Sequence, residues 1–426
     1  MVVQAEHATP KPQGRSLWVF RETPSEPAGQ YACHVNTPTH IAERFRPFGS
    51  SIFAEMTRLA NLHKAVNLSQ GFPDFDGPDV AKTAAIEAIN AGHAQYARMS
   101  GVPILNAAIA ERWENEGKGT IDPDANVTVT SGCSEGIINC LVGLLNPGDE
   151  VIVFEPFFDF YVAGTAMAGA MCKFVALHPP RDGGREFWFD EAELRGAFTE
   201  RTRAIVVNSP HNPTGKVFTR RELELIASLC LERNVIAISD EVYDQLIFDP
   251  AFPHISIATL PGMRDLTITL NSLGKTFSLT GWKVGWAIAC PALTAAVRAC
   301  HQFMTFSTST PLQYGAAAAL REAGDYAAKM RELYSGNRDR LSAALTKAGL
   351  KVYPSYSTYF LMADHTARGF DDDKAFVQHL IEKVGVAAIP PSGFYNRKEL
   401  GSPLVRFAFC KRRETVDEAI RRLEKL

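Results

Sequence analysis

The sequence predicts an α/β protein. We expect a large domain with a mostly parallel seven-stranded sheet flanked by helices, plus a smaller α+β domain. The chain has 426 residues, enough for two domains with separate cores. From residue 79 to about 320, short apolar runs alternate with helical patterns. This alternation is typical of a parallel sheet covered on both faces.

The large domain begins with helical patterns at Val80–Ala91 and Val102–Glu116, and a third helix, Cys133–Leu145, is stopped by an Asn-Pro-Gly turn. Apolar runs between and after these helices are short and bounded by turn residues, which favours buried strands. The predicted strands are Val127–Thr130, Glu150–Phe154, Met171–Leu177, Ala204–Asn208, Val235–Ser239, Leu266–Leu270 and Val284–Ala289.

After residue 320 the pattern changes to one long helix, short strands and a closing helix. The predicted elements are Tyr326–Ala348, Leu350–Tyr353, Tyr359–Ala363, Val386–Ile389, Leu404–Ala408 and Thr415–Lys425. Residues 51–64 carry apolar side chains at helical spacing after a cap at Ser50 or Ser51, and we expect this helix to complete the small domain. The predicted division is therefore an N-terminal arm at 1–45, a small-domain part at 46–65, a large domain at 66–320 and a C-terminal small domain at 321–426.

Composition excludes several function classes. The formal net charge of −3 gives no reason to expect nucleic acid or an anionic membrane as partner. No apolar run approaches the roughly 18–20 residues that span a bilayer, and the N-terminus lacks a signal-peptide pattern. The eight cysteines are scattered without Cys-x-x-Cys pairs, so we expect neither a disulfide framework nor a metal site. A cytoplasmic protein is the simplest interpretation.

Polar and aromatic residues follow the predicted strands, at the edge where open α/β sheets bind ligands. The loop Ser131–Gly136 opens a helix and can cradle a phosphate, although small-residue helix starts are common. The aromatic cluster Glu155–Tyr161 can stack on a planar ring, although such clusters more often belong to a core. Asn212 lies between turn residues, and Asp240 and Tyr243 follow the fifth strand.

Lys275 lies in a stretch, Asn271–Trp286, that contains no acidic residue. An arbitrary lysine is usually a surface residue, but apolar runs on both sides place this one between core elements. A desolvated lysine amine is nucleophilic and suits Schiff-base chemistry. The sequence therefore suggests that Lys275 carries pyridoxal phosphate.

The other strand ends supply what this cofactor needs. Its ring nitrogen must be protonated next to a carboxylate, which Asp240 can provide. Asn212 and Tyr243 can hydrogen bond its 3-oxygen. Its phosphate needs a helix N-terminus and a cation. The predicted phosphate residues are Gly132, Cys133, Ser134, Ser272 and Lys283.

At this point a family resemblance becomes specific. The motifs that carry it are Asn67–Phe75, Gln95-Tyr96, Glu155–Asp159, Asn208–Pro213, Ser239–Tyr243, Ser272–Phe277, Thr280–Lys283 and Val405–Phe407. From about Ser51 to the C-terminus the chain resembles the class I/II (fold type I) aminotransferases. Within them it is most similar to the kynurenine/glutamine transaminase and bacterial methionine aminotransferase-like group.

The resemblance implies roles that the residues alone do not. Phe157 would stack on the pyridine ring, and Arg406 would hold the substrate α-carboxylate with its planar fork. Backbone at Gly71 would contact the same carboxylate, and Asn212 would also bind the substrate. In a homodimer with shared active sites, Tyr96 would reach the partner's cofactor phosphate and Phe306 would line the partner's pocket. Without the resemblance, Arg406 would be interpreted as a surface arginine and Gly71 as a turn.

The predicted function is transfer of the amino group from a large uncharged or aromatic L-amino acid to a 2-oxo acid. Donors of the kynurenine, glutamine, methionine and Phe/Tyr type are expected, with Lys275 as general base and acid and with Asp240 and Tyr243 assisting. The chain departs from the family at Ile52-Phe53, Cys133-Ser134 and Ser307, which leaves substrate preference open. One alternative is a cysteine-conjugate C–S β-lyase at the same site. A non-catalytic sensor is a distant alternative, because the arm is too short and not basic enough to bind DNA.

Overall fold

The computed structural model describes residues 40–49, 52–181 and 184–426. The chain divides into two compact units, Met1–Ile41 and Ala42–Leu426. Almost all described residues belong to the second unit, and most of the predicted arm and the predicted cap at Ser50 or Ser51 lie outside them. None of the helices in the described residues is long and apolar enough to cross a membrane.

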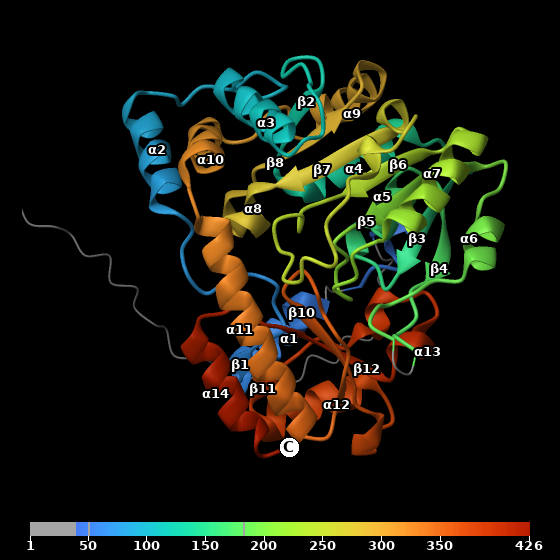
Figure 1. Cartoon of the computed structure of the whole chain (residues 1–426), viewed down its shortest axis with the longest axis vertical. Helices are drawn as coiled ribbons and strands as arrows, with labels where there is room; N and C mark the ends of the chain where they lie inside the picture. The colour runs from blue at the N-terminus through green and yellow to red at the C-terminus, as the bar shows by residue number, and fades with distance from the viewer. Residues whose placement is uncertain (1–39, 50–51, 182–183) are drawn as a thin grey trace, which may run out of the picture. The chain divides into compact units, whose positions relative to one another are not determined.

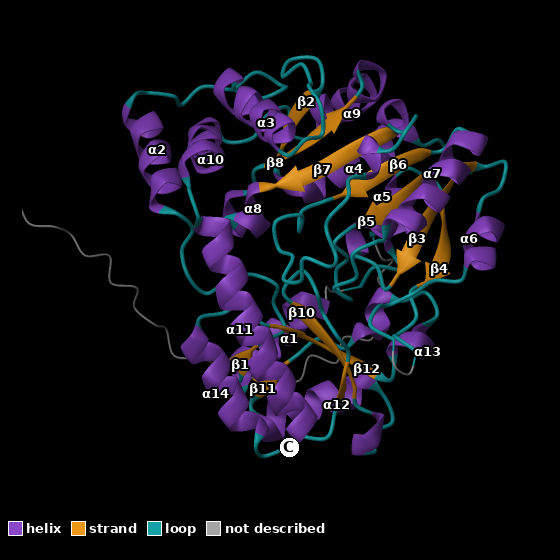
Figure 2. Cartoon of the chain, in the orientation of Figure 1, coloured by secondary structure: helices purple, strands orange, loops and turns teal. Residues whose placement is uncertain are grey.

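The second unit contains a seven-stranded, mostly parallel sheet, as predicted (Figures 1 and 2). Its strand order is β2-β8-β7-β6-β5-β3-β4, and β8 is antiparallel to both of its neighbours while the other pairs are parallel. The strands are β2 (Val127–Thr130), β3 (Glu150–Glu155), β4 (Met171–Ala176), β5 (Thr202–Asn208), β6 (Ile236–Asp240), β7 (Thr267–Ser272) and β8 (Gly285–Ala289).

Helices cover both faces of this sheet, which explains why its strands are rich in apolar residues on both sides. Successive strand residues point to opposite faces. Val151 and Val153 of β3 pack in one core with Ile137, whereas Ile152 packs in another with Leu223. The helices of this part are α2 (Asp79–Asn90), α3 (Pro103–Asn115), α4 (Gly132–Leu144), α5 (Asp159–Met167), α6 (Glu191–Ala197), α7 (Arg220–Arg233), α8 (Leu273–Thr276), α9 (Pro291–Met304) and α10 (Thr310–Glu322).

The smaller α+β part contains a three-stranded antiparallel sheet, ordered β12-β10-β9, and a parallel pair, β1-β11. Its strands are β1 (Val66–Asn67), β9 (Lys351–Val352), β10 (Phe360–Asp364), β11 (Val386–Ala387) and β12 (Leu404–Ala408). Its helices are α1 (Ile52–Leu62), α11 (Tyr326–Lys347), α12 (Asp373–His379), α13 (Lys398–Gly401) and α14 (Arg413–Leu423). Met56 of α1 is buried in the same core as Leu341, Phe407 and Val416, so α1 packs with the C-terminal elements.

Candidate active site

A cavity lies beyond the carboxyl ends of β5, β6 and β7, which are neighbours in the sheet, and beside the first turn of α4. Parallel strands bring their carboxyl ends to one edge, so residues far apart in sequence meet there. The predicted residues that line the cavity are Gly132, Cys133, Ser134, Asn212, Asp240, Tyr243, Ser272, Lys275 and Lys283. Gly71 and Arg406 do not line it, but they hydrogen bond to Lys275 and Asn212, which do.

Lys275 enters the cavity from α8, the short helix that directly follows β7. Its Nζ donates to the backbone oxygen of Gly71 at 3.3 Å and lies 5.7 Å from the ring centre of Tyr243. No carboxylate pairs with it among the described residues. Burial lowers the pKa of its amine, since desolvation disfavours the charged form. A buried amine of lowered pKa is a good nucleophile and proton acceptor.

The carboxylate of Asp240, at the end of β6, is 4% exposed. Tyr161 donates its hydroxyl to Oδ2 at 2.7 Å. The Cys133 thiol contacts Oδ1 at 3.7 Å, and the backbone N–H of Val242 reaches Oδ1 at 3.4 Å. Burial raises the pKa of Asp240, and these donors counteract the rise. Within the described part of the chain, no lysine or arginine forms an ion pair with this carboxylate, which leaves it able to hold a cationic N–H.

Two asparagines fix the carboxyl end of β5, the strand next to β6. Asn208 donates its amide to the backbone oxygen of Asp240 at 3.0 Å, and its side-chain oxygen accepts from the backbone N–H of Asn212 at 2.8 Å. Tyr243 packs edge-to-face on Tyr359 at 5.2 Å, and burial raises the pKa of its phenol, so it remains a hydrogen-bond donor. Both predicted donors to the 3-oxygen, Asn212 and Tyr243, therefore lie in the cavity wall.

The first turn of α4 and Lys283 form an anion-binding corner. Gly132 has a φ of 75°, and a Cβ there would lie 3.1 Å from Lys283 Nζ. Lys283 Nζ also lies 3.5 Å from the hydroxyl of Ser134. A helix N-terminus carries partial positive charge and unpaired N–H groups, and the adjacent ammonium adds a full charge. Ser272, at the end of β7, supplies a further hydroxyl in the same cavity.

Arg406, in the middle of β12, is 2% exposed, so the interpretation as a surface arginine does not hold. Its guanidinium donates to the backbone oxygen of Ser69 at 2.9 Å and approaches Asn212 Oδ1 at 3.4 Å, while Nε has no partner. No carboxylate pairs with it in the residues that the structure describes. Burial lowers its pKa to about 10. A buried guanidinium without an anion is complementary to a carboxylate ligand.

The arginine also stacks among aromatic rings, with its Cζ 4.3 Å from the ring centre of Phe360 and 5.3 Å from that of Phe394. Gly71 lies against the same ring: an added Cβ would come within 2.7 Å of Phe360 Cζ. Its backbone oxygen accepts from Tyr359 at 2.6 Å as well as from Lys275. Glycine is therefore required at position 71 by close packing, not by a turn.

The structure corrects the prediction for Phe157. Its ring is buried in the core, 5.4 Å from the ring of Phe174, while Phe158 lines the cavity. The backbone is extended at Phe158 just before α5, and successive side chains on extended backbone point in opposite directions. A sequence motif with two adjacent phenylalanines does not show which of them faces the ligand.

Tyr96 and Phe306 lie outside the cavity. Their rings meet edge-to-face at 5.8 Å, and the two residues are 87% and 43% exposed. They form an exposed aromatic pair next to α9 and α10 and do not line the cavity of this chain.

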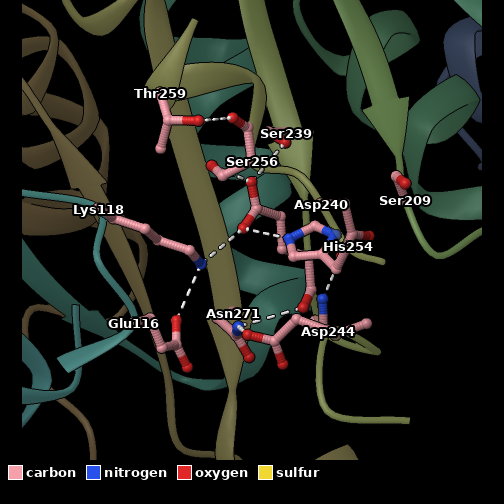
Figure 3. Close-up of polar contacts among 12 residues, drawn as sticks. Glu116, Lys118, Ser209, Ser239, Asp240, Asp244, His254, Ser256, Thr259 and Asn271 are labelled. Atoms are coloured by element: carbon pink, nitrogen blue, oxygen red, sulfur yellow. Dashed lines mark hydrogen bonds and ion pairs between the residues drawn. The ribbon is translucent and has the colours of Figure 1, made fainter. Parts of the chain in front are cut away.

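Sequence reasoning missed a buried charge cluster behind the cavity (Figure 3). The carboxylate of Glu241, next to Asp240, accepts from Lys118 at 3.2 Å and from His254 at 2.9 Å. Burial alone would raise the pKa of Glu241, but these two groups hold it below its usual range. Asn271 donates to the backbone oxygen of Glu241 at 3.1 Å, which ties β6 to β7. The cluster thus fixes β6, which ends at Asp240, to β7, which leads directly into α8 and Lys275.

The family comparison decides the assignment. The model described as aminotransferase class I and II matches residues 63–423.

The chain is a class I/II aminotransferase.

Known members of the family cover nearly all of this aminotransferase. A solved structure of N-succinyldiaminopimelate aminotransferase from Mycobacterium tuberculosis is 45% identical, covers 90% of this chain and 99% of its own, and superimposes with a TM-score of 0.87. Methionine aminotransferase of Escherichia coli is 36% identical over 92% of this chain and 100% of its own. Human kynurenine–oxoglutarate transaminase 1 is 38% identical over 88% and 95%. These relatives confirm the predicted fold class and family group.

The cofactor of this aminotransferase is pyridoxal 5′-phosphate. The cavity fits it in three independent ways. Among the described residues, the buried amine of Lys275 has no carboxylate partner and the buried carboxylate of Asp240 forms no ion pair. The N-terminus of α4 lies beside the ammonium of Lys283. These groups match an aldehyde, a protonated ring nitrogen and a phosphate.

Proposed function

We propose that this aminotransferase takes the amino group from large uncharged or aromatic L-amino acids, of the kynurenine, glutamine, methionine and Phe/Tyr type, and passes it to a 2-oxo acid. The composition of the cavity wall carries this proposal. Among its described lining residues the cations are Lys275 and Lys283, which the cofactor occupies, and the rest are apolar, aromatic or neutral polar apart from Asp240. No further cation there would hold a second carboxylate of an acidic donor.

Each cavity residue has one role in the proposal. Lys275 Nζ would bond to the aldehyde carbon of the cofactor, and Asp240 would hold its ring nitrogen. Asn212 and Tyr243 donate to the 3-oxygen. The phosphate is bound by the backbone and hydroxyl of Gly132–Ser134, by Ser272 and by Lys283. Phe158, rather than Phe157, covers the pyridine ring.

The substrate is oriented by groups from the smaller part of the molecule. Arg406 receives the α-carboxylate, because it is a buried guanidinium with an unpaired Nε. Gly71 brings backbone to the same carboxylate. The aromatic rings around Arg406 exclude water and so strengthen the ion pair.

Pyridoxal phosphate, when bound, withdraws the electron pair left on the substrate α-carbon after its proton is removed. The chain's own residues move that proton. Once the substrate amine has displaced it from the cofactor, Lys275 Nζ would take the proton from the α-carbon, since burial favours the neutral amine, and would donate it to the former aldehyde carbon of the cofactor. Asp240 keeps the ring nitrogen protonated. Tyr243 and Asn212 steady the ring through its 3-oxygen.

Two copies of the chain would form the working enzyme. Tyr96 and Phe306 are exposed and lie apart from their own cavity, which supports their predicted role at the partner's site. Phe303 of α9, 84% exposed, and Met304, 44% exposed, extend the same apolar surface. A dimer interface there would bury these side chains and complete both sites.

A donor panel tests the substrate proposal. Kynurenine, glutamine, methionine, phenylalanine and tyrosine are each mixed with the enzyme, and cofactor absorbance is followed without acceptor. We expect several of these donors to convert the cofactor to its amine form in this half-reaction, and aspartate to convert little of it. N-succinyldiaminopimelate is included because the relative named for it is 45% identical. Turnover confined to aspartate or to the succinylated donor would refute the proposal, and pyruvate release from cysteine conjugates would identify the lyase alternative.

A further inference from the structure

Two side-chain donors on helices α4 and α5 contact the carboxylate of Asp240. The Tyr161 hydroxyl, on α5, lies 2.7 Å from Oδ2, and the Cys133 thiol, on α4, lies 3.7 Å from Oδ1. Both line the cavity, and Tyr161 is 3% exposed. The ring of Phe158 packs edge-to-face on Tyr161 at 5.8 Å and fixes its orientation.

Both groups are permanent donors. Burial raises the pKa of the Tyr161 phenol well above its usual value, and the nearby charge of Asp240 raises it further. The pKa of the Cys133 thiol is raised by the same two causes. Neither group therefore ionises at neutral pH, so each presents a proton to Asp240. The charge of Lys275 also acts on the Asp240 carboxylate and lowers its pKa.

We propose that Tyr161 is a positioning residue that keeps the shared proton on the ring nitrogen of the cofactor rather than on Asp240, with Cys133 as a weaker second donor. The inference rests on the proposed role of Asp240. A buried carboxylate deprived of donors becomes a stronger base. It would then draw the proton away from the ring nitrogen. The hydroxyl of Tyr161 prevents this by stabilising the ionised carboxylate.

Loss of the Tyr161 hydroxyl should affect one property of the cofactor, the ability of its ring to withdraw electrons. A ring nitrogen that loses its proton withdraws electrons poorly, so removal of the α-proton slows. Substrate binding at Arg406 and phosphate binding at Lys283 do not involve Tyr161. Loss of its hydroxyl should therefore lower the rate of α-proton removal and leave donor affinity almost unchanged.

The test is Tyr161→Phe, which removes one oxygen and keeps the ring. The holoenzyme is prepared with cofactor labelled with ¹⁵N in the ring, and we expect its nitrogen resonance to shift toward that of the unprotonated pyridine. The single-turnover rate with a donor that the wild type accepts should fall by about tenfold to a hundredfold, the usual effect of losing a hydrogen bond to a charged group. Cys133→Ala should shift the resonance less, in the same direction.

Two controls separate this role from a structural one. Tyr395→Phe removes a buried phenolic hydroxyl that has no hydrogen-bond partner among the described residues, and it should leave the resonance and the rate unchanged. Reconstitution with 1-deazapyridoxal phosphate, which has carbon in place of the ring nitrogen, should make the wild type and Tyr161→Phe equally fast.

An unshifted ¹⁵N resonance in Tyr161→Phe, or a rate loss that persists with the deaza cofactor, would overturn the inference while leaving the proposed function intact. Failure of the wild type to bind the cofactor or turn over any donor would instead overturn the proposed function. If Tyr161→Phe does not fold, the resonance of Cys133→Ala decides, and an unshifted signal there refutes the inference.

Discussion

Arg406→Met should separate activity from stability. The guanidinium is 2% exposed, and in the described residues it has no anionic partner and an unpaired Nε. In the substrate complex it would form a bidentate pair with the α-carboxylate. Each charged hydrogen bond contributes about 1.5–3 kcal/mol, so the two bonds of the pair contribute roughly 3–6 kcal/mol. Its loss should lower kcat/KM for every amino donor by about 10²- to 10⁴-fold.

The stability of the same variant should change in the other direction or not at all. Replacing a buried charge by an apolar side chain of similar volume is often neutral or stabilising by about 1–4 kcal/mol. Methionine can pack against Phe360 and Phe394, which surround the guanidinium. Urea unfolding of wild type and variant measures this effect, and steady-state kinetics with methionine and a 2-oxo acid measures the loss of activity.

The exposed arginine Arg220, 62% exposed at its side chain, provides a matched control. Arg220→Met should change kcat/KM less than twofold. A kcat/KM for Arg406→Met within about threefold of wild type would refute the reasoning, as would a loss of stability as large as the loss of activity.

Two further variants test the parts around the cavity. Gly132→Ala places a Cβ 3.1 Å from Lys283 Nζ at a φ of 75°, and it should weaken cofactor retention about tenfold or more in equilibrium dialysis, with unchanged retention arguing against the phosphate corner. Glu241→Gln removes one of the two carboxylates that pair with the buried Lys118, whose partner Glu116 at 2.9 Å remains, and should cost about 1–3 kcal/mol in urea unfolding at pH 7. Because the folded pKa of Glu241 is lowered, the stability it contributes is present above its unfolded pKa and is lost as pH falls through the folded value, so the gap between wild type and variant should narrow in acid.

The fold was predictable because its signals are local. Each strand of the large sheet is a short apolar run ended by turn residues, and the predicted and observed bounds, such as Glu150–Phe154 and Glu150–Glu155, differ by one or two residues. Since parallel strands share an edge, the strand-end residues could be grouped into one site before any coordinates were known. In the structure Lys275 and Asp240 line the same cavity.

The features that could not be predicted depend on the direction in which a side chain points or on contacts with residues far away in the sequence. The motif at Phe157-Phe158 does not show which ring faces the cavity, because that depends on backbone dihedral angles before α5. The cluster at Glu241 draws Lys118 from 123 positions away, and a single sequence gives no sign of that pairing. The burial of Arg406 likewise came from pairing of β12 with β10, a long-range contact.

The central claim is that Lys275 is the residue bonded to the cofactor. Reduction of the holoenzyme with borohydride, followed by proteolysis and mass measurement of the peptides, tests it directly. The account predicts one pyridoxyl adduct, on Lys275, and none in Lys275→Ala. An adduct on Lys283 or any other lysine of the active wild type, or a full adduct in Lys275→Ala, would contradict it.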